Sequence, residues 1–408
     1  MSLFFDLTGY EIKKIICRKR TVIVLTLVIF LGAFSVFGTI LGNYYYSDGN
    51  GGEIAVSRYE DEMLDRRNGE ALSGRIIDAD LIMEAVDACR QVPLNGSAYY
   101  IDTPEYQNIA RKYSEICDIV SSVFNISGMA EFQQITREQA EQFDAVRREN
   151  REYVIENSDI SENMRGYWRK CLDENPETLT YEYSGGYYRF VAIMYTTAFM
   201  AGAAIAVMIS GIFSEEYTSG ADSLILSSKH GKGILIGAKL LAAFGIAACL
   251  IILLTVISYI ETMIVWGRQG ANAPLELWMG IFPYPLTIAQ SALLYSVCIL
   301  AACLFFTAVT SFFSAWLKAP FNTVVIMSVI LIAPMFLTLP DSAPVWLANL
   351  VNLLPTNMMA FWVAMGEIQF EMFGTVIPPY VFHPVFAVIV SGICVCLSYR
   401  IFRRHQVV

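Results

Sequence analysis

Residues 240–260 read LLAAFGIAACLIILLTVISYI, a run of 21 residues that contains no charged side chain. A helix needs about 20 predominantly apolar residues to cross about 30 Å of hydrocarbon, because each residue adds about 1.5 Å. No water is present at that depth, so the backbone amides and carbonyls have to pair within the helix itself. This stretch therefore predicts a membrane-spanning helix and decides the class of the whole fold.

The composition of the whole chain agrees with this prediction. Hydrophobic residues make up 55% of the sequence and charged residues 16%, whereas an average soluble protein has about 25% charged residues. The mean hydropathy is +0.47. We expect an all-α polytopic membrane protein with six transmembrane helices, at residues 21–42, 189–213, 234–264, 286–313, 320–339 and 377–402.

Basic residues near the ends of these spans predict the orientation, because Lys and Arg are enriched in cytoplasmic loops. If six helices alternate, the four basic groups fall on one side of the membrane; they lie at residues 13–20, 229–239, 318 and 400–404. Both termini are then cytoplasmic, including a short tail at residues 403–408. The segment 43–188 is extracellular.

A rival count of seven spans exists, because residues 345–366 are also apolar. Asn349, Asn352 and Asn357 interrupt that stretch at depths where unpaired polar groups are costly, and a seventh crossing would place the basic end of the chain outside. We therefore expect residues 340–376 to form an extracellular interfacial or re-entrant segment, broken at Leu354-Pro355.

The first 20 residues precede the first span and carry both apolar and charged side chains. Glu11, Lys13 and Lys14 are interleaved with apolar residues, which predicts an amphipathic elbow helix on the inner membrane surface. A frayed basic tail is the alternative. A cleaved secretory signal is disfavoured, because the apolar core is long and residues 38–43 make a poor cleavage site.

The segment 43–188 is long enough for one small domain. Between positions 44 and 186 it holds 28 acidic and 14 basic residues, whereas the rest of the chain holds 10 acidic and 14 basic residues. Thr103-Pro104-Glu105 is a helix start signal. Apolar residues between 132 and 153 share one helical face, so we expect a long helix that packs on its neighbours or, alternatively, lies on the membrane. Residues 178–183 alternate like a strand.

Chemistry-bearing motifs are scarce. Of nine cysteines, Cys89, Cys117 and Cys171 lie in the segment 43–188, where one disulfide with one thiol left over is an open alternative. With three histidines, no zinc site of ordinary spacing can be drawn. Residues 228–233 lack the spacing of a phosphate loop. We expect no catalytic residue, no metal, no cofactor bound by this chain and no nucleic-acid partner.

The stretch between the second and third spans narrows the function most. Residues 213–232 read FSEEYTSGADSLILSSKHGK and combine aliphatic residues, a glycine and charges of both signs; Lys239 follows at the foot of the next span. This pattern predicts a helix on the inner membrane surface that a cytoplasmic partner contacts. The plainer interpretation is a loop whose charges only follow the positive-inside rule.

These features together resemble a known family, the permease subunit of type 2 ATP-binding cassette (ABC) exporters with a large extracellular domain between the first two spans. The motifs are Tyr10-Glu11-Ile12-Lys13-Lys14, Phe213-x-x-Glu216-x-x-x-Gly220, Leu226-Ser227-Ser228, Lys239 and Leu353-Leu354-Pro355. They resemble the elbow helix, the first cytoplasmic loop and the extracellular re-entrant segment of that family. The tip at residues 227–231 departs from commoner versions, which carry Pro and Arg.

The resemblance implies a transporter that is not itself an enzyme. Two permease chains, identical or related, would assemble with two copies of a cytoplasmic ATP-binding subunit, which binds ATP and Mg. The predicted residues that couple to this ATPase are Phe213, Glu215, Glu216, Gly220, Leu226, Ser227, Ser228, Lys229, Lys232 and Lys239. Among them, Glu215, Glu216, Lys229 and Lys232 would make docking contacts, and Gly220 would allow close helix approach.

The resemblance also implies a cargo class and a location. The cargo would be a peptide antibiotic, a drug or a lipid-like molecule, exported across a bacterial plasma membrane whose lipids surround the chain. A different class of function stays open, namely a non-transporting membrane receptor or scaffold whose acidic extracellular domain binds a partner. A polytopic membrane enzyme is disfavoured, because clustered His, Asp or Ser motifs are missing at the span ends.

Overall fold

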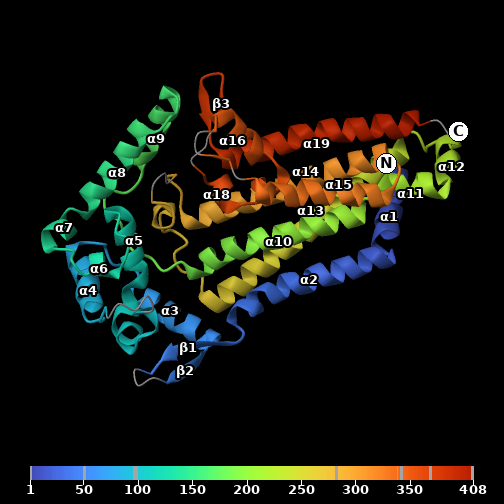
Figure 1. The fold of residues 1–408 in the computed structure, drawn as a ribbon. Coiled ribbons are helices and arrows are strands. Elements are labelled where there is room, and N and C mark those ends of the chain that lie inside the picture. Colours follow the sequence, from blue (N-terminus) through green and yellow to red (C-terminus); the bar gives the residue numbers. More distant parts are fainter. Residues whose placement is uncertain are drawn as a thin grey trace.

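The computed structural model describes residues 2–48, 52–94, 100–280, 284–337, 339–340, 343–366 and 370–405. The chain forms a bundle of long helices with a smaller helical domain at one end, which we call the appended domain (residues 43–183) (Figure 1). Both chain termini lie at the opposite end of the bundle, which we call the terminal end. The fold is mostly helical, as the sequence predicts.

Five helices of the described chain are long and apolar enough to cross a membrane. They are α2 (Lys19–Ile40), α10 (Gly185–Ile209), which continues into α11 (Gly211–Ser219), α13 (Ile234–Trp266), α14 (Ile288–Leu317) and α19 (Pro379–Arg404). A sixth apolar helix is shorter: α15 (Pro320–Ile332) runs into a 3-10 turn, Ala333–Phe336. Pro334 has no amide hydrogen for the α-helical pattern, so the helix tightens there. Of the expected span 320–339, residue 338 lies outside the described part of the chain.

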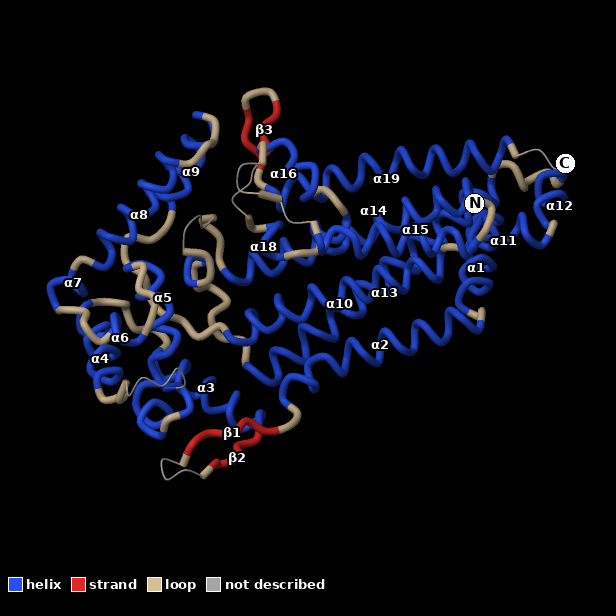
Figure 2. The backbone as a smooth tube through the Cα atoms, viewed as in Figure 1, coloured by secondary structure: helices blue, strands red, loops and turns tan. Residues whose placement is uncertain are grey.

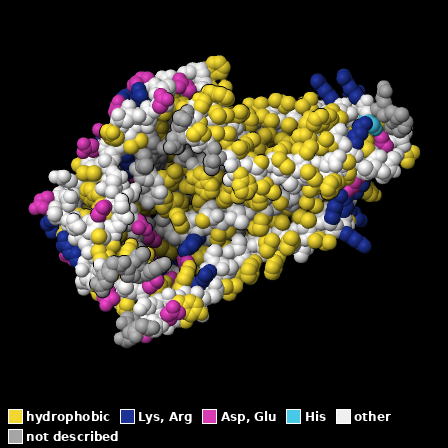
Figure 3. All heavy atoms as spheres, in the orientation of Figure 1, with side chains coloured by type: hydrophobic (Ala, Val, Ile, Leu, Met, Phe, Trp, Pro, Cys, Tyr) yellow, Lys and Arg dark blue, Asp and Glu magenta, His cyan; other side chains and the backbone are white. Residues whose placement is uncertain are grey.

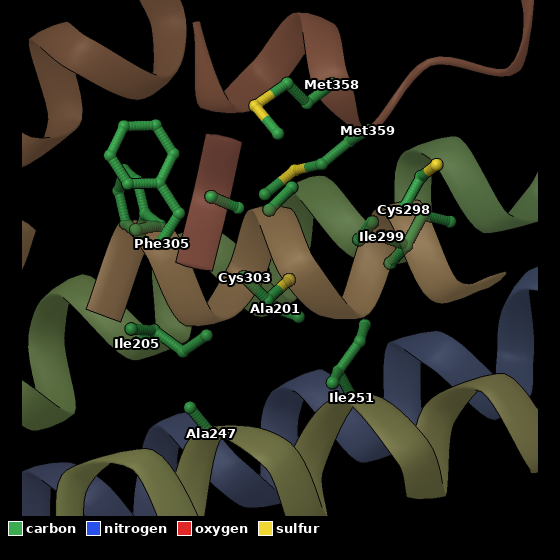
Figure 4. Packing of buried hydrophobic residues seen from close by; sticks show 14 of the residues in the cluster. Ala201, Ile205, Ala247, Ile251, Cys298, Ile299, Cys303, Phe305, Met358 and Met359 are labelled. Carbon is green, nitrogen blue, oxygen red and sulfur yellow. The ribbon is translucent and has the colours of Figure 1, made fainter. Parts of the chain in front are cut away.

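The bundle is packed around α14, which contacts α10, α13, α15 and α19. Its core mixes alanine and cysteine with larger aliphatic, aromatic and methionine side chains, and the small residues let the helix backbones approach closely. Figure 4 shows part of this core, with Ala201 and Ile205 of α10, Ala247 and Ile251 of α13, Cys298, Ile299, Cys303 and Phe305 of α14, and Met358 and Met359.

The outside of the bundle is also apolar (Figure 3). Large hydrophobic side chains are exposed along α2 and α19, such as Ile23, Phe30, Val388 and Ile389. A continuous exposed apolar surface of this kind is unfavourable in water and favourable in lipid. Lys and Arg side chains gather at the terminal end, whereas Asp and Glu are spread over the appended domain. The composition, the helix lengths and the surface of the chain are thus those of a multi-pass membrane protein.

The appended domain consists of a hairpin and short helices around one core. The strands are β1 (Asn43–Ser47) and β2 (Glu53–Ser57), which pair antiparallel. The helices are α3 (Arg58–Leu72), α4 (Ala79–Arg90), η1 (Tyr100–Asp102), η2 (Tyr106–Ala110), η3 (Arg111–Tyr113), α5 (Ser114–Phe124), α6 (Met129–Phe132), α7 (Arg137–Glu141), α8 (Phe143–Asn157) and α9 (Glu162–Glu174). Ile116 and Val120 of α5 point into the core. The Thr103 hydroxyl accepts a hydrogen bond from the Tyr106 amide at 3.3 Å, which fits the predicted helix start.

Two local predictions for this domain are wrong. Residues 132–153 do not form one helix, because Thr136 and Gln139 form a reciprocal capping box that starts a separate helix, α7. Residues 178–183 contribute only an isolated bridge between Thr180 and Ile76. The hairpin at 43–57, shown in red in Figure 2, was not predicted, although its run of tyrosines has high strand propensity.

The segment before α19 breaks at Leu354-Pro355, as predicted. It contains α16 (Val345–Asn352), α17 (Pro355–Met358), α18 (Phe361–Ala364) and a small hairpin of β3 (Phe370–Met372) and β4 (Thr375–Ile377). The Thr356 hydroxyl donates to the Leu331 carbonyl at 2.6 Å, so α17 is fastened to the end of α15. Its re-entrant character stays a prediction, and residues 341–342 and 367–369 lie outside the described part.

Buried and half-buried ion pairs attach the appended domain to the bundle. Arg147 and Arg151 of α8 both donate to Glu276, in the 3-10 turn η4 (Leu275–Leu277) between α13 and α14. All three side chains are buried. Glu62 of α3 accepts from Arg189 of α10 at 2.6 Å and from the indole of Trp266 at 2.7 Å. Charges held out of water in this way hold their neighbours in fixed positions, since a displaced partner leaves an uncompensated charge.

Replacement of Glu276 tests this attachment. Glu276→Gln leaves the buried Arg151 without its carboxylate and leaves Arg147 with Asp144 alone, so we expect a loss of stability on the order of 3 kcal/mol. The measurement is thermal unfolding of the purified full-length chain in mild detergent. Glu149→Gln, an exposed site on the same helix α8, is the matched control. Equal midpoints for the two variants would show that the ion pairs do not hold the domain.

Candidate functional site

The predicted coupling segment folds as two helices joined by a glycine. Helix α11 ends at Ser219, α12 (Ala221–Ser227) follows, and Gly220 between them has φ +70°. A side chain is strained in this left-handed conformation, so glycine is favoured there. Nothing lies within 4 Å of the position of a Cβ atom on Gly220. The glycine therefore serves the turn between the helices, and the close helix approach that we expected at this position is absent.

A buried lysine joins three elements next to this turn. The side chain of Lys239 on α13 is 1% exposed. Its Nζ donates to Glu11 of α1 (Ser2–Ile16) at 2.9 Å and to Glu216 of α11 at 2.6 Å. Lys14 of α1 also donates to Glu216 at 2.6 Å. A buried charge is tolerated only when it is paired and hydrogen-bonded, so these four residues, which we call the charge cluster, bind α1, α11 and α13 to one another.

Two further ion pairs lie beside the charge cluster. Glu215 binds Arg18, at 2.6 Å, and Arg20, both at the junction of α1 and α2. The N-terminal segment thus forms ion pairs with both glutamates of α11, Glu215 and Glu216. Lys13, the remaining predicted elbow residue, is exposed and lies outside the charge cluster.

The structure divides the predicted coupling residues into two groups. Glu216 is 3% exposed and bound within its own chain, so its carboxylate offers no surface for docking to another subunit. Phe213 and Leu226 are buried as well. The residues open to a partner form a surface that we call the α12 tip, made of Leu224, Ser227, Ser228, Lys229 and Lys232.

The C-terminal end of α19 contacts the α11–α12 pair. The ring of Phe402 lies 5.0 Å from that of Phe213, and His405 approaches Asp222 of α12 at 3.1 Å. The Tyr399 hydroxyl donates to the Lys232 carbonyl at 3.2 Å. Sequence reasoning missed these partners, because nothing in the sequence near residue 400 indicates contact with a loop about 180 residues earlier. A displacement of α12 that moves α11 would reach α13 through the Glu216–Lys239 ion pair. It would reach α19 through the contact of Phe213 with Phe402.

At the opposite end of the bundle a recess of about 390 Å³ lies between the appended domain and the helix ends. Helix α5 forms one wall with Glu115 and Asp118, while Tyr188 of α10 and Trp266 of α13 face it from the bundle. The lining combines aromatic side chains with many charged and polar ones, and a concave site of this volume is large enough to hold a small molecule. No sequence motif indicated the recess, because its walls come from distant segments.

Unpaired negative charge distinguishes this recess. Arg111 is neutralised by Asp61 at 2.5 Å and Asp65 at 2.6 Å. By contrast, Glu115 accepts only the Tyr181 hydroxyl, at 2.5 Å, and Asp118 has no hydrogen bond or ion pair within the described residues. Both carboxylates stay open to solvent in the recess, yet the surrounding protein displaces much of their water, and this burial raises the pKa of each. Lys112 also lines the recess, but five carboxylates in its lining outnumber three basic side chains, so the recess favours a cation with an apolar body.

Comparisons of the chain with protein-family models, with curated proteins and with solved structures find no match. Within the described residues, no group of three or more His, Cys, Asp or Glu side chains is placed to hold a metal ion. The charge cluster with the α12 tip, and the recess, are thus the two places on which a function can be argued.

A double-mutant cycle tests the charge cluster. Lys239→Met leaves Glu11 and Glu216 buried without their shared cation, and we expect it to cost on the order of 3 kcal/mol of stability. Adding Glu216→Gln removes a buried carboxylate that is then paired with Lys14 alone, so the double variant should lose less than the two single losses together, by more than about 1 kcal/mol. Lys232→Met, at an exposed site, is the control. Strict additivity of the measured losses would contradict the cluster.

The recess carboxylates predict a pH dependence. Their folded-state pKa values are raised, so the folded chain holds more protons than the unfolded one, and their contribution to stability falls as pH rises through the folded pKa values. We expect Glu115→Gln/Asp118→Asn to stabilise the chain at pH 7 and to have less effect at pH 4.5, as measured by thermal unfolding. The exposed pair Glu105→Gln/Glu149→Gln should lack this pH trend. A pH-independent difference between wild type and the first variant would contradict the assignment.

Proposed function

We propose that this chain is the transmembrane permease subunit of an ABC exporter, driven by ATP that a separate cytoplasmic subunit hydrolyses. The observation that carries the proposal is the charge cluster. It fixes a short helix pair with an exposed tip, α11–α12, to the elbow helix and to the foot of α13. One end of this helix pair is bound to the membrane helices and the other end is exposed. A partner that presses on the exposed end can therefore move the membrane helices.

The proposed topology has six spans, with both termini in the cytoplasm and the appended domain outside. Both termini lie at one end of the bundle (Figure 1), an arrangement that fits an even number of passages. Five helices reach the necessary length, and the 17 residues Pro320–Phe336 cover about 25 Å at about 1.5 Å per residue. Helix α17 supports α15 through Thr356, whose hydroxyl donates to the Leu331 carbonyl. Basic residues at the terminal end agree with a cytoplasmic location.

In the proposed mechanism, two ATP-binding subunits close on ATP and Mg and press on the α12 tip of each permease. Leu224, which is 76% exposed, and Lys229 make the contact. Because Glu216 joins α11 to α13, and Phe402 joins it to α19, the force tilts these helices together. A second permease chain completes the transporter in a cell membrane, the plasma membrane of a bacterium. A peptide antibiotic, a drug or a lipid-like molecule is the cargo class that the family resemblance favours.

A second candidate function is a membrane receptor or scaffold without transport. The recess favours it, since a ligand bound between the appended domain and the ends of α10 and α13 would change their separation. This candidate needs no ATPase partner, and the α11–α12 pair would then contact a signalling protein.

Affinity purification of the tagged chain from its native membrane in mild detergent separates the two candidates. We expect an ATP-binding subunit to copurify, with ATP hydrolysis in the eluate. Leu224→Asp and Lys229→Glu should each reduce the bound ATPase at least tenfold without lowering the unfolding midpoint. Lys170→Glu, exposed on the appended domain, is the control.

The outcomes are distinct. A stable chain that brings down no ATPase would refute the exporter and favour the receptor. An ATPase that binds both tip variants as well as wild type would keep the exporter and remove the α12 tip from the docking surface.

A further inference from the structure

The appended domain holds three cysteines, and the structure brings two of them together. Cys89 on α4 and Cys117 on α5 are 28 residues apart in sequence, and their Sγ atoms are 3.6 Å apart. Cys89 is fully buried and Cys117 is half-buried. Cys171 on α9 lies elsewhere, in the core that includes Trp168 and Tyr284. Of the three pairings that three cysteines allow, the geometry selects one.

The distance between the two sulfur atoms is short enough for a covalent bond after a small adjustment. A disulfide has an S–S length of about 2.05 Å, so the sulfur atoms have to approach by about 1.5 Å. Side-chain rotation about χ1 moves a sulfur by more than this. Neither helix has to separate from its neighbours, because Cys89 already packs in the same core as Ile116 and Val120 of α5.

We propose that Cys89 and Cys117 form a disulfide in the mature protein. The proposal rests on the extracellular location given to the appended domain under the proposed function, because structural disulfides form and persist in oxidising compartments. The third cysteine, Cys171, stays a thiol beside Tyr167.

The reaction needs an oxidant, and a thiol–disulfide oxidase outside the membrane has the right chemistry. The thiolate of Cys117, the more accessible of the two, attacks the disulfide of the oxidase and releases one of its sulfurs as a thiolate. The Cys89 thiolate then attacks the Cys117 sulfur of this mixed disulfide and displaces the second sulfur of the oxidase. The two protein thiols have lost two protons and two electrons, and the oxidase disulfide has become a dithiol.

The bond would fix the wall of the recess. Cys117 lies on α5 between Glu115 and Asp118, which face the recess from that helix. A covalent link to α4, whose Leu81 and Ile82 are fully buried in the core, would hold α5 against the rest of the appended domain. The carboxylates would then keep their positions relative to Trp266 and Tyr188 of the bundle.

Differential alkylation of the full-length chain tests the proposal. Cells that express the chain in a host with an extracytoplasmic oxidase are quenched with acid. Free thiols are blocked with N-ethylmaleimide under denaturing conditions, and disulfides are then reduced and labelled with the deuterated reagent. We expect Cys89 and Cys117 to carry the heavy label in at least nine tenths of molecules, and Cys171 to carry the light one. Cys89→Ser should shift Cys117 to the light label, whereas Cys171→Ser should change nothing.

An accessibility measurement separates the failure of this proposal from the failure of the proposed topology. Glu149→Cys places a thiol on the exposed face of α8, and a membrane-impermeant maleimide applied to intact cells should label it. Labelling together with light, free Cys89 and Cys117 overturns the disulfide alone. Light, free Cys89 and Cys117 together with labelling of Glu149→Cys only after lysis overturns the disulfide and the extracellular placement together.

A stability measurement adds a readout that does not depend on the host. Oxidation of the purified full-length chain with glutathione disulfide should raise its unfolding midpoint, and a phosphine reductant should lower it again. Cys89→Ala/Cys117→Ala should abolish both shifts. Equal midpoints for oxidised and reduced wild type would overturn the proposal, since a bond that closes a long loop restricts the unfolded chain.

Discussion

The pairing of Lys239 with Glu11 and Glu216 is the constraint on which the terminal end of the molecule depends. An ammonium group that is 1% exposed is stable only if carboxylates reach it. These come from residues 228 and 23 positions away in sequence. Helix α1 therefore cannot behave as a loose tail, and α11 cannot swing independently of α13. Helices α1 and α11, which were expected to couple to a partner, are thus joined to α13 by ion pairs.

Similar ion pairs hold the other end. Glu276 fastens α8 to the turn between α13 and α14, and Glu62 fastens α3 to α10 and to Trp266. The bundle between these two ends is packed mainly through small and aliphatic side chains, whose contacts have little directional preference. Charged groups at both ends and apolar contacts between them suit helices that tilt as rigid units while their ends stay attached.

The sequence predicted the elements that local chemistry controls. The long apolar runs are helices, Pro355 starts a new helix, and Thr103 caps the turn that begins after it. Predictions that depended on distant partners were wrong in the following cases. Glu216 was expected at a docking surface, yet Lys14 and Lys239 occupy it. The helix expected over residues 132–153 is split by the capping box at Thr136, a local competition whose outcome depends on how α7 and α8 pack.

What the sequence by itself determined is where the membrane-type helices lie and which end of the bundle is basic. The hydrocarbon acts as a solvent on every residue of a run, so length and composition suffice. Only the tertiary structure decided which charges are internal, which surface of α12 stays open, and which two of three cysteines meet. Hydrogen bonds, ion pairs and disulfides require atoms within about 2–4 Å of one another, and sequence separation does not reveal which distant residues the fold brings that close.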